Sequence, residues 1–410
     1  MWVFFIVLAL MGAPIWGAPP SYQAQPQETI DAAAAEHNNQ GAQLANQGRL
    51  LEAVREFRQA IELVPNFVGA YYNLGRVYMQ LKRYKDATQA FAAAVQARPN
   101  YGDAWYQLGI ALQMQNAFSD AGKAYLSTLS FYPNDPNLLY RLGYVFLQEK
   151  DWAQAAQFWE RLRDEYPDHP ALSQVQQHLP HLYFNLGTQH YVNGATEEAK
   201  KAFLKTVDLN PQYGAAFYNL GLVYRDLEQF DQAQSALENA LELQYDPQQV
   251  RSILGHVHTL KGSLKEAEAL FHGLLKDGIQ SLDPHRGLVT VKLKQKDLQG
   301  ALVEALNVVA NAPQDPASFL LLAYVYEHNG EGERYGYGFQ GDQAIKAYKR
   351  AIRLNKHDVT PHFNLGMLYG RMGDWASSVK ALKKAEEIDP SHVGVKKWLP
   401  DVQARYDQAQ

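Results

Sequence analysis

The sequence contains no cysteine, and this absence excludes several kinds of chemistry. Disulfide bonds, thiolate zinc sites, iron–sulfur clusters and cysteine nucleophiles all require that side chain. A surplus of positive charge is also lacking, because 38 Lys and Arg residues stand against 43 Asp and Glu residues. The net charge of -5 gives no overall attraction to nucleic acid. Hydrophobic residues make up 47% of the 410-residue chain, which is enough to build a folded core.

Long apolar runs are missing except at the N-terminus. The run Trp2–Met11 has the length of a signal-peptide core and is too short to span a bilayer. No Lys or Arg precedes it, and no small–x–small triplet lies near Ala18. We expect residues 1–18 to be a signal peptide or an uncleaved N-terminal anchor, followed by a polar linker and helix entry at 19–33. The expected location is the periplasm or cell envelope, with membrane anchoring by residues 2–18 as the alternative.

A 34-residue period runs through the rest of the chain and predicts a repeat fold. A spacer at 170–179 and an insertion in the ninth window interrupt the period without destroying it. Residues 393–410 follow the last window and have the apolar spacing of a capping helix. The array occupies residues 34–392, in windows that start near 34, 68, 102, 136, 180, 214, 248, 282, 316 and 359.

Each window predicts two helices. Places four, seven, eight and eleven fall on one face of the first helix. Glycine recurs at place eight, as in Gly75, although it lowers helix propensity by about 1 kcal/mol. We therefore expect a close helix approach there, with the small residue twelve places later, Ala87, as the matching surface. The aromatic four places further on, Phe91, is expected to fill the gap to the next repeat, and Pro99 to end the second helix.

Three segments carry a resemblance to a known family. YYNLGRVY (71–78), FYNLGLVY (217–224) and HFNLGMLY (362–369) resemble the first helix of the tetratricopeptide (TPR) repeat. The resemblance implies an all-α fold, a right-handed superhelical solenoid of about ten helix–turn–helix repeats with a C-terminal capping helix and a concave groove. It also implies a non-enzymatic scaffold that binds a peptide or a partner protein.

Few patterns in the sequence suggest catalysis or metal binding. Gly336, Gly338 and Gly341 match the spacing of a dinucleotide-binding loop, but the preceding residues 319–326 are in helix phase rather than strand phase. We expect Gly330–Gly341 to be a flexible loop instead. The pairs His256/His258 and His357/His362 are expected to be ordinary surface or inter-repeat histidines. No catalytic residue, metal or cofactor is therefore predicted.

The side of the first helix opposite the packing stripe carries the candidate binding site. In TPR folds this side lines the concave groove, and an amide there offers both a donor and an acceptor to a peptide backbone. Aromatic residues at the neighbouring fifth place would add contact area. At Ile253, Gly287 and Leu321 the row becomes apolar, which suggests a second patch. The candidate residues are Asn73, Gln107, Arg141, Asn185, Asn219 and Asn364, with Tyr72, Tyr106, Tyr140, Phe184 and Tyr218 beside them, and Arg76 at place nine.

Two interpretations of this row stay open, and the function has one prediction and two alternatives. The row is either a peptide-binding surface or only family consensus, with its rings packed partly against a neighbouring helix. The function predicted is a protein-interaction scaffold in the assembly of an envelope or membrane complex. A self-assembling structural solenoid is the first alternative, and an enzyme with an unrecognised site is the second. The expected partner is a protein or peptide, with no nucleic acid.

Overall fold

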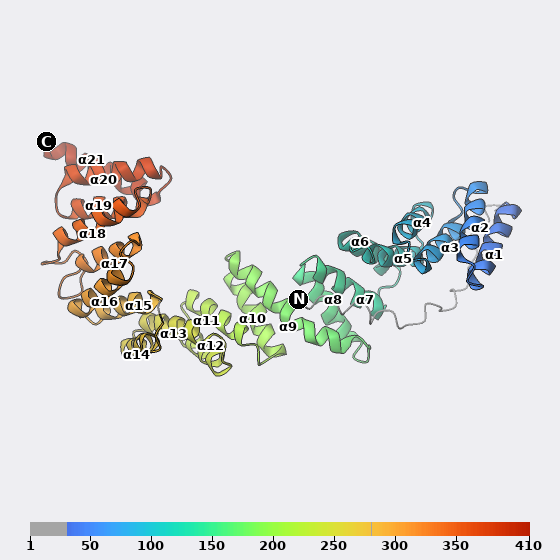
Figure 1. Cartoon of the computed structure of the whole chain (residues 1–410), viewed down its shortest axis with the longest axis horizontal. Coiled ribbons are helices and arrows are strands. Elements are labelled where there is room, and N and C mark those ends of the chain that lie inside the picture. Colours follow the sequence, from blue (N-terminus) through green and yellow to red (C-terminus); the bar gives the residue numbers. More distant parts are fainter. Residues whose placement is uncertain (1–30, 280) are drawn as a thin grey trace. The chain divides into compact units, whose positions relative to one another are not determined.

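The computed structural model describes residues 31–279 and 281–410 (Figure 1). Over these residues the chain forms 21 helices and no strand. The expected signal peptide or anchor at 1–18 lies outside the described residues, as does most of the linker at 19–33. No helix in 31–279 or 281–410 combines the length and the hydrophobicity that a membrane crossing requires. The all-α solenoid fold expected from the 34-residue period is confirmed.

The chain divides into two compact units at Val175 and Gln176. The first contains α1 (Ala32–Asn46), α2 (Leu50–Leu63), α3 (Val68–Gln80), α4 (Tyr84–Ala97), α5 (Gly102–Gln113), α6 (Phe118–Leu129), α7 (Pro136–Gln148) and α8 (Trp152–Glu165). The division falls within α9 (Leu172–Val192). The second contains α10 (Thr196–Leu209), α11 (Gly214–Asp226), α12 (Phe230–Glu242), α13 (Pro247–Lys261), α14 (Leu264–Lys276), α15 (Asp283–Lys294), α16 (Leu298–Asn311), α17 (Pro316–Tyr326), α18 (Gly341–Leu354), α19 (Val359–Arg371), α20 (Trp375–Ile388) and α21 (Val393–Ala409).

Within each compact unit, helices that follow one another in sequence pack together in pairs. The repeated proline ends the second helix of a pair as expected, because α4 ends at Ala97 before Pro99 and α10 ends at Leu209 before Pro211. Aspartates begin several helices by accepting a backbone N–H, as Asp135 does from Asn137 at 2.8 Å. These start and stop signals set the boundaries of the helix pairs.

The close approach at the repeated glycine involves an aromatic ring that the sequence analysis did not assign to it. A Cβ on Gly75 would lie 2.6 Å from Cε1 of Phe91, and one on Gly109 would lie 2.5 Å from Cε1 of Tyr125. The ring sixteen places after the glycine therefore lies nearest to it, and the small residue twelve places after it is also close in the last repeat, where the Ser378 hydroxyl donates to the Gly366 carbonyl at 2.6 Å. The ring packs against the glycine of its own repeat and also reaches the next one, since a Cβ on Gly287 would lie against Cζ of Phe271 in the repeat before it. An aromatic ring needs this space because it is too large to lie over a helix that carries a side chain there.

The two interruptions of the repeat are the spacer at 170–179, which is mostly helix, and the insertion Gly330–Gly341, which is an ordered loop. Most of the spacer at 170–179 is helical, because α9 begins at Leu172 and continues through Pro180. The insertion Gly330–Gly341 is held by backbone hydrogen bonds, from Tyr335 N to Glu327 O at 2.6 Å and from Gln340 N to Tyr326 O at 2.9 Å. The expectation of a flexible loop is therefore corrected.

A buried carboxylate explains why the insertion is ordered. Glu327 is fully buried, and its carboxylate accepts hydrogen bonds from Arg334 at 2.7 Å and from the Tyr348 hydroxyl at 2.8 Å. The Arg334 guanidinium also lies over the rings of Tyr324 and Tyr335. Several interactions thus converge on one ion pair, which fixes the loop against α17 and α18.

The last helix covers the end of the array. Val395, Leu399 and Val402 of α21 are buried against Val379 and Leu382 of α20. Without α21, these side chains of α20 would face water. The predicted C-terminal capping helix is therefore confirmed.

Candidate functional site

The candidate polar residues stand at place six of their windows, on the first helices. Those that are half-buried are Asn73, Gln107, Arg141, Asn185, Asn219 and Asn364. Asn73 donates a hydrogen bond from Nδ2 to Oδ1 of Asn38, the fifth-place residue of the preceding repeat, at 3.1 Å. Asn219 donates instead to the carbonyl of Ala215 in its own helix, at 2.9 Å. The amides of Gln107, Asn185 and Asn364 have no hydrogen-bond partner within the part of the chain that the structure describes.

Arg141 repeats the Asn73 arrangement with a cation. Its Nε donates to the Tyr106 hydroxyl at 3.0 Å, and its guanidinium lies over the Tyr106 ring at 5.7 Å from the ring centre. Its Nη1 reaches Gln113 Oε1 at 3.4 Å, and the same oxygen accepts from the Tyr125 hydroxyl at 2.7 Å. The sixth-place side chain of one repeat therefore contacts the fifth-place side chain of the repeat before it in both cases.

The fifth-place rings pack mainly within their own repeat. Tyr72 lies between Phe91 of the second helix and Tyr101 at the end of the window, with ring centres 5.9 and 5.1 Å away. Phe184 lies in the same way between Phe203 and Tyr213, at 5.8 and 5.0 Å. Burial raises the pKa of the Tyr72 phenol above its ordinary value. These rings support the helix pair and leave only part of their surface to a partner.

Two members of the predicted row differ from the expectation of exposed contact area. Tyr140 is only 7% exposed because it stacks on Trp159 and donates its hydroxyl hydrogen bond to Gln174 at 3.0 Å. Tyr218 is only 8% exposed and packs against Tyr245. Both rings are part of the core, so neither can provide a broad contact surface for a ligand.

The second apolar patch predicted at Ile253, Gly287 and Leu321 is not a single surface in the structure, whereas Arg76 does lie next to Tyr72 of the predicted row. Gly287 is buried, and a side chain there would meet the Phe271 ring. Ile253 and Leu321 are half-buried members of two different apolar clusters. These three residues therefore do not form one exposed apolar surface. Arg76 lies over the ring of Tyr72, with its guanidinium carbon 5.9 Å from the ring centre.

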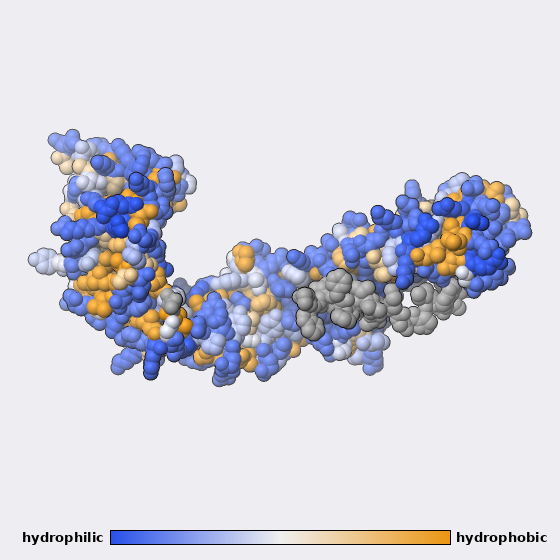
Figure 2. Space-filling model, viewed as in Figure 1, coloured by the Kyte–Doolittle hydropathy of each residue, from blue (hydrophilic) through white to orange (hydrophobic). Residues whose placement is uncertain are grey.

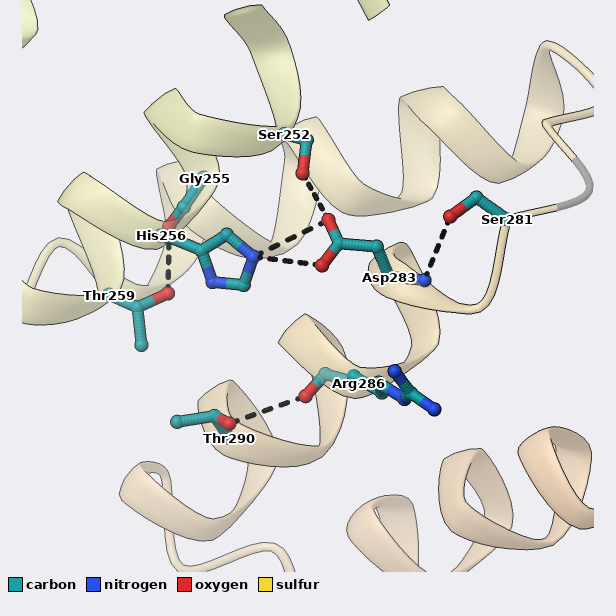
Figure 3. Close-up of polar contacts among 8 residues, drawn as sticks. All are labelled: Ser252, Gly255, His256, Thr259, Ser281, Asp283, Arg286 and Thr290. Carbon is teal, nitrogen blue, oxygen red and sulfur yellow. Dashed lines mark hydrogen bonds and ion pairs between the residues drawn. The ribbon is translucent and has the colours of Figure 1, made fainter. Parts of the chain in front are cut away.

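A polar cluster between α13 and α15 was missed by the sequence analysis. Asp283 accepts a hydrogen bond from the Ser252 hydroxyl, and its Oδ1 lies 3.3 Å from Nε2 of His256 (Figure 3). The contacts from His256 and Ser252, together with nearby Arg286, lower the pKa of the Asp283 carboxyl. The signal that could have found this cluster is the repeat phase, since Ser252 and His256 hold places five and nine of one window and Asp283 holds place two of the next.

The geometry of this cluster does not prepare a serine nucleophile. The Asp283 carboxylate lies between Ser252 and the His256 ring, so the ring is not placed to remove the hydroxyl proton (Figure 3). Among the described residues, no group of three His, Cys, Asp or Glu side chains could hold a metal ion. The arrangement can link consecutive repeats and offer polar atoms to a partner.

Two histidines of the pairs considered in the sequence analysis, His258 and His362, lie in the core. His258 holds place eleven and His362 holds place four, which both lie on the packing stripe. Both are buried, and burial lowers the pKa of each imidazole. The expectation that they lie at the surface or between repeats was wrong for these two, because the helical phase puts them inside.

Comparison with known proteins supports the same fold. Models described as tetratricopeptide repeat match residues 39–102, 218–281, 82–138, 138–169 and 359–392, and a TPR repeat model matches residues 340–373. Together these matches cover more than half of the chain. A crystal structure of a tetratricopeptide repeat protein from Parabacteroides merdae has a TM-score of 0.48 and 15% identity, and the match covers 65% of this chain and 98% of that one.

Curated relatives share only part of their length with this chain. Superkiller protein 3 of Schizosaccharomyces pombe is 22% identical over 216 residues, which are 51% of this chain and 15% of that protein. Human protein O-mannosyl-transferase TMTC1 is 24% identical over 212 residues, which are 52% of this chain and 23% of that protein. Tetratricopeptide repeats indicate a protein–protein interaction scaffold. From the repeat matches and the helix-pair fold, the chain belongs to the tetratricopeptide repeat family.

Proposed function

We propose that the chain is a non-enzymatic scaffold that binds an extended polypeptide along the sixth-place residues of its first helices. The observation that carries the proposal is the half-buried amide of Asn185, which has no hydrogen-bond partner among the described residues. A polar group in this setting is better satisfied when a partner supplies the missing hydrogen bonds. Gln107 in the first compact unit and Asn364 in the second are in the same condition.

The neighbouring residues suit an extended chain. Phe184 lies next to Asn185 and retains a partly exposed ring, which can contact an apolar side chain of the partner. A backbone amide of the partner can pair with Asn185, and this pairing requires no particular side chain. The site would therefore recognise an extended backbone with an apolar residue beside it.

The test compares two asparagines of the second compact unit. A partner is first captured by crosslinking in the native cell fraction, and its bound segment is then titrated against purified variants. Asn185→Ala should weaken binding about two- to tenfold, since one net hydrogen bond contributes roughly 0.5–1.5 kcal/mol. Asn239→Ala is the control, because Asn239 is a half-buried asparagine on a second helix with no hydrogen-bond partner among the described residues.

Salt dependence separates this site from a charged one. Binding through amides should change little with added salt, whereas binding through Arg76 or Arg141 should weaken strongly. Equal affinity of wild type and Asn185→Ala would refute the amide site. Strong salt dependence would move the site to the arginines.

We also propose that the protein is exported and acts in the assembly of an envelope or membrane complex. The support is the apolar run Trp2–Met11 followed by a polar, proline-bearing segment. Cell fractionation with mass spectrometry of the N-terminal peptide tests this. Full-length protein that retains residues 1–18 in the cytosolic fraction would contradict it.

A further inference from the structure

The outward face of α18 carries four cations. Lys346, Lys349, Arg350 and Arg353 follow the i, i+3, i+4, i+7 spacing that places them on one side of the helix. Arg350 is half-buried and the other three are exposed. None of the four has an ion-pair partner within 31–279 or 281–410, although Asp342 lies one turn before Lys346. We call these four residues the cationic face.

Other repeats do not have this pattern at the same four places of the second helix. In α8 these places hold Gln157, Glu160, Arg161 and Asp164, and in α12 they hold Ser235, Glu238, Asn239 and Glu242. In α20, which follows α18 as the second helix of the next repeat, they hold Lys380, Lys383, Lys384 and Glu387. The concentration of positive charge is therefore a property of the last two repeats and not of the repeat fold.

The preceding second helix carries exposed apolar side chains at the equivalent places. In α16, Val303 is 55% exposed and Leu306 is 44% exposed. On the face drawn in Figure 2, hydrophobic surface gathers over α16 and α17 and a strongly hydrophilic band follows over α18 and α19. Apolar side chains and unpaired cations thus belong to consecutive repeats of the second compact unit.

We propose that the cationic face, with Val303 and Leu306, binds the anionic surface of a lipid bilayer. Clusters of four to eight Lys and Arg residues on a helix are typical of proteins that bind anionic lipids. The four charges are spread along two turns of α18 and three of them are exposed, which suits a surface of many phosphates better than one small anion. The exposed apolar side chains would enter the boundary between headgroups and acyl chains. This site is separate from the first-helix row proposed above.

Contacts of the cations decide which residues should be changed. Arg350 lies over the Phe319 ring at 5.7 Å, and Lys349 lies over the Tyr369 ring at 5.9 Å. Substitution of either residue could alter packing as well as charge. Lys346 and Arg353 have no such ring contact among the described residues. The double variant Lys346→Gln/Arg353→Gln therefore removes two charges with the least effect on the fold, because glutamine preserves helix propensity.

The experiment measures sedimentation of the full chain with two kinds of vesicle. One contains phosphatidylcholine alone and the other contains phosphatidylcholine with phosphatidylglycerol, so any binding by the N-terminal apolar run appears with both. The double variant should bind the anionic vesicles about 25-fold more weakly, at roughly fivefold for each cation removed. Lys265→Gln/Lys276→Gln is the control, since it removes the same charge from exposed lysines of another repeat.

The outcomes distinguish a bilayer from other anionic partners. The proposal expects the control variant to bind as wild type does, and expects Leu306→Gln to weaken vesicle binding but not retention on a heparin column. Equal losses for the double variant and the control would overturn it, because net charge alone would then explain the effect. Wild type that shows no preference for phosphatidylglycerol would also overturn it, and heparin binding in that case would point to a soluble polyanion.

Discussion

The Phe91 ring occupies the space that a side chain on Gly75 would need, with Cε1 2.6 Å from the ideal Cβ position. Gly75→Ala should therefore lower the free energy of unfolding by about 1–3 kcal/mol through overpacking. The loss exceeds the gain in helix propensity that alanine normally brings. Urea denaturation followed by circular dichroism measures the change.

Gly122 provides the matched control for this substitution. It also lies within a helix of the first compact unit, but the nearest atoms to its Cβ position are 3.8 Å away. Gly122→Ala should therefore raise the free energy of unfolding, by about 0.5–1 kcal/mol. Equal effects of the two substitutions would show that close packing at Gly75 does not matter.

Acid should destabilise the protein through its buried histidines. Burial lowers the pKa of His258 below its ordinary value of 6.5. The unfolded chain therefore binds a proton at His258 more readily than the folded chain does. The contribution of neutral His258 to stability is complete above pH 6.5 and is lost as the pH falls below that value. His258→Gln should make the unfolding free energy fall less between about pH 7 and 5 than it does in wild type.

The control for this pH experiment is a histidine that is not buried. His357 is exposed, so His357→Gln controls for the loss of an imidazole that is not packed in the core. A thermal or urea series over several pH values measures both variants. Identical slopes for His258→Gln and wild type would exclude His258 as a source of acid sensitivity.

The ion pair under the insertion loop should control its order. Glu327→Gln removes the charge that Arg334 contacts at 2.7 Å and should lower stability by about 1–3 kcal/mol. Limited proteolysis should then cut within Gly330–Gly341 faster than in wild type. Tyr337→Ala is the control, because this side chain is 102% exposed and its removal should change neither property.

Loss of the capping helix should affect the last repeats first. The pair Val395→Ala/Leu399→Ala removes buried contacts of α21 and should cost about 2–5 kcal/mol for each large side chain truncated. Hydrogen exchange should rise mainly in α19, α20 and α21, because each repeat contacts only its neighbours. Uniform loss of protection from residue 31 onward would contradict this local behaviour.

The sequence predicts the fold well because the repeat phase carries the necessary information. Burial of Leu74, Ala87 and Phe91 follows from their places in the window. The contact of Gly75 with the Phe91 ring was not predicted, because the periodicity of one helix marks its packed side without naming the residue that meets it. Only the relative placement of two helices shows that the Phe91 ring lies nearest to that space.

The candidate site was harder to predict for the same reason. The helical phase places Tyr140 next to Arg141 on the side away from the stripe, yet Trp159 and Gln174 come from later segments and cover the Tyr140 ring. The pairing of His256 with Asp283 also depends on the contact between two repeats. The binding role of Asn185 and the other amides stays a prediction until a partner is titrated.

The hydrogen bonds between repeats have a consequence for folding speed. Ser252 with Asp283 and Asn73 with Asn38 join residues only 31 and 35 positions apart, so contact order is low for so long a chain. Folding therefore requires the closure of short loops rather than a search for distant partners. In stopped-flow refolding, we expect the pairing of neighbouring helices to limit the refolding rate of each compact unit. That rate should change little when further repeats are added.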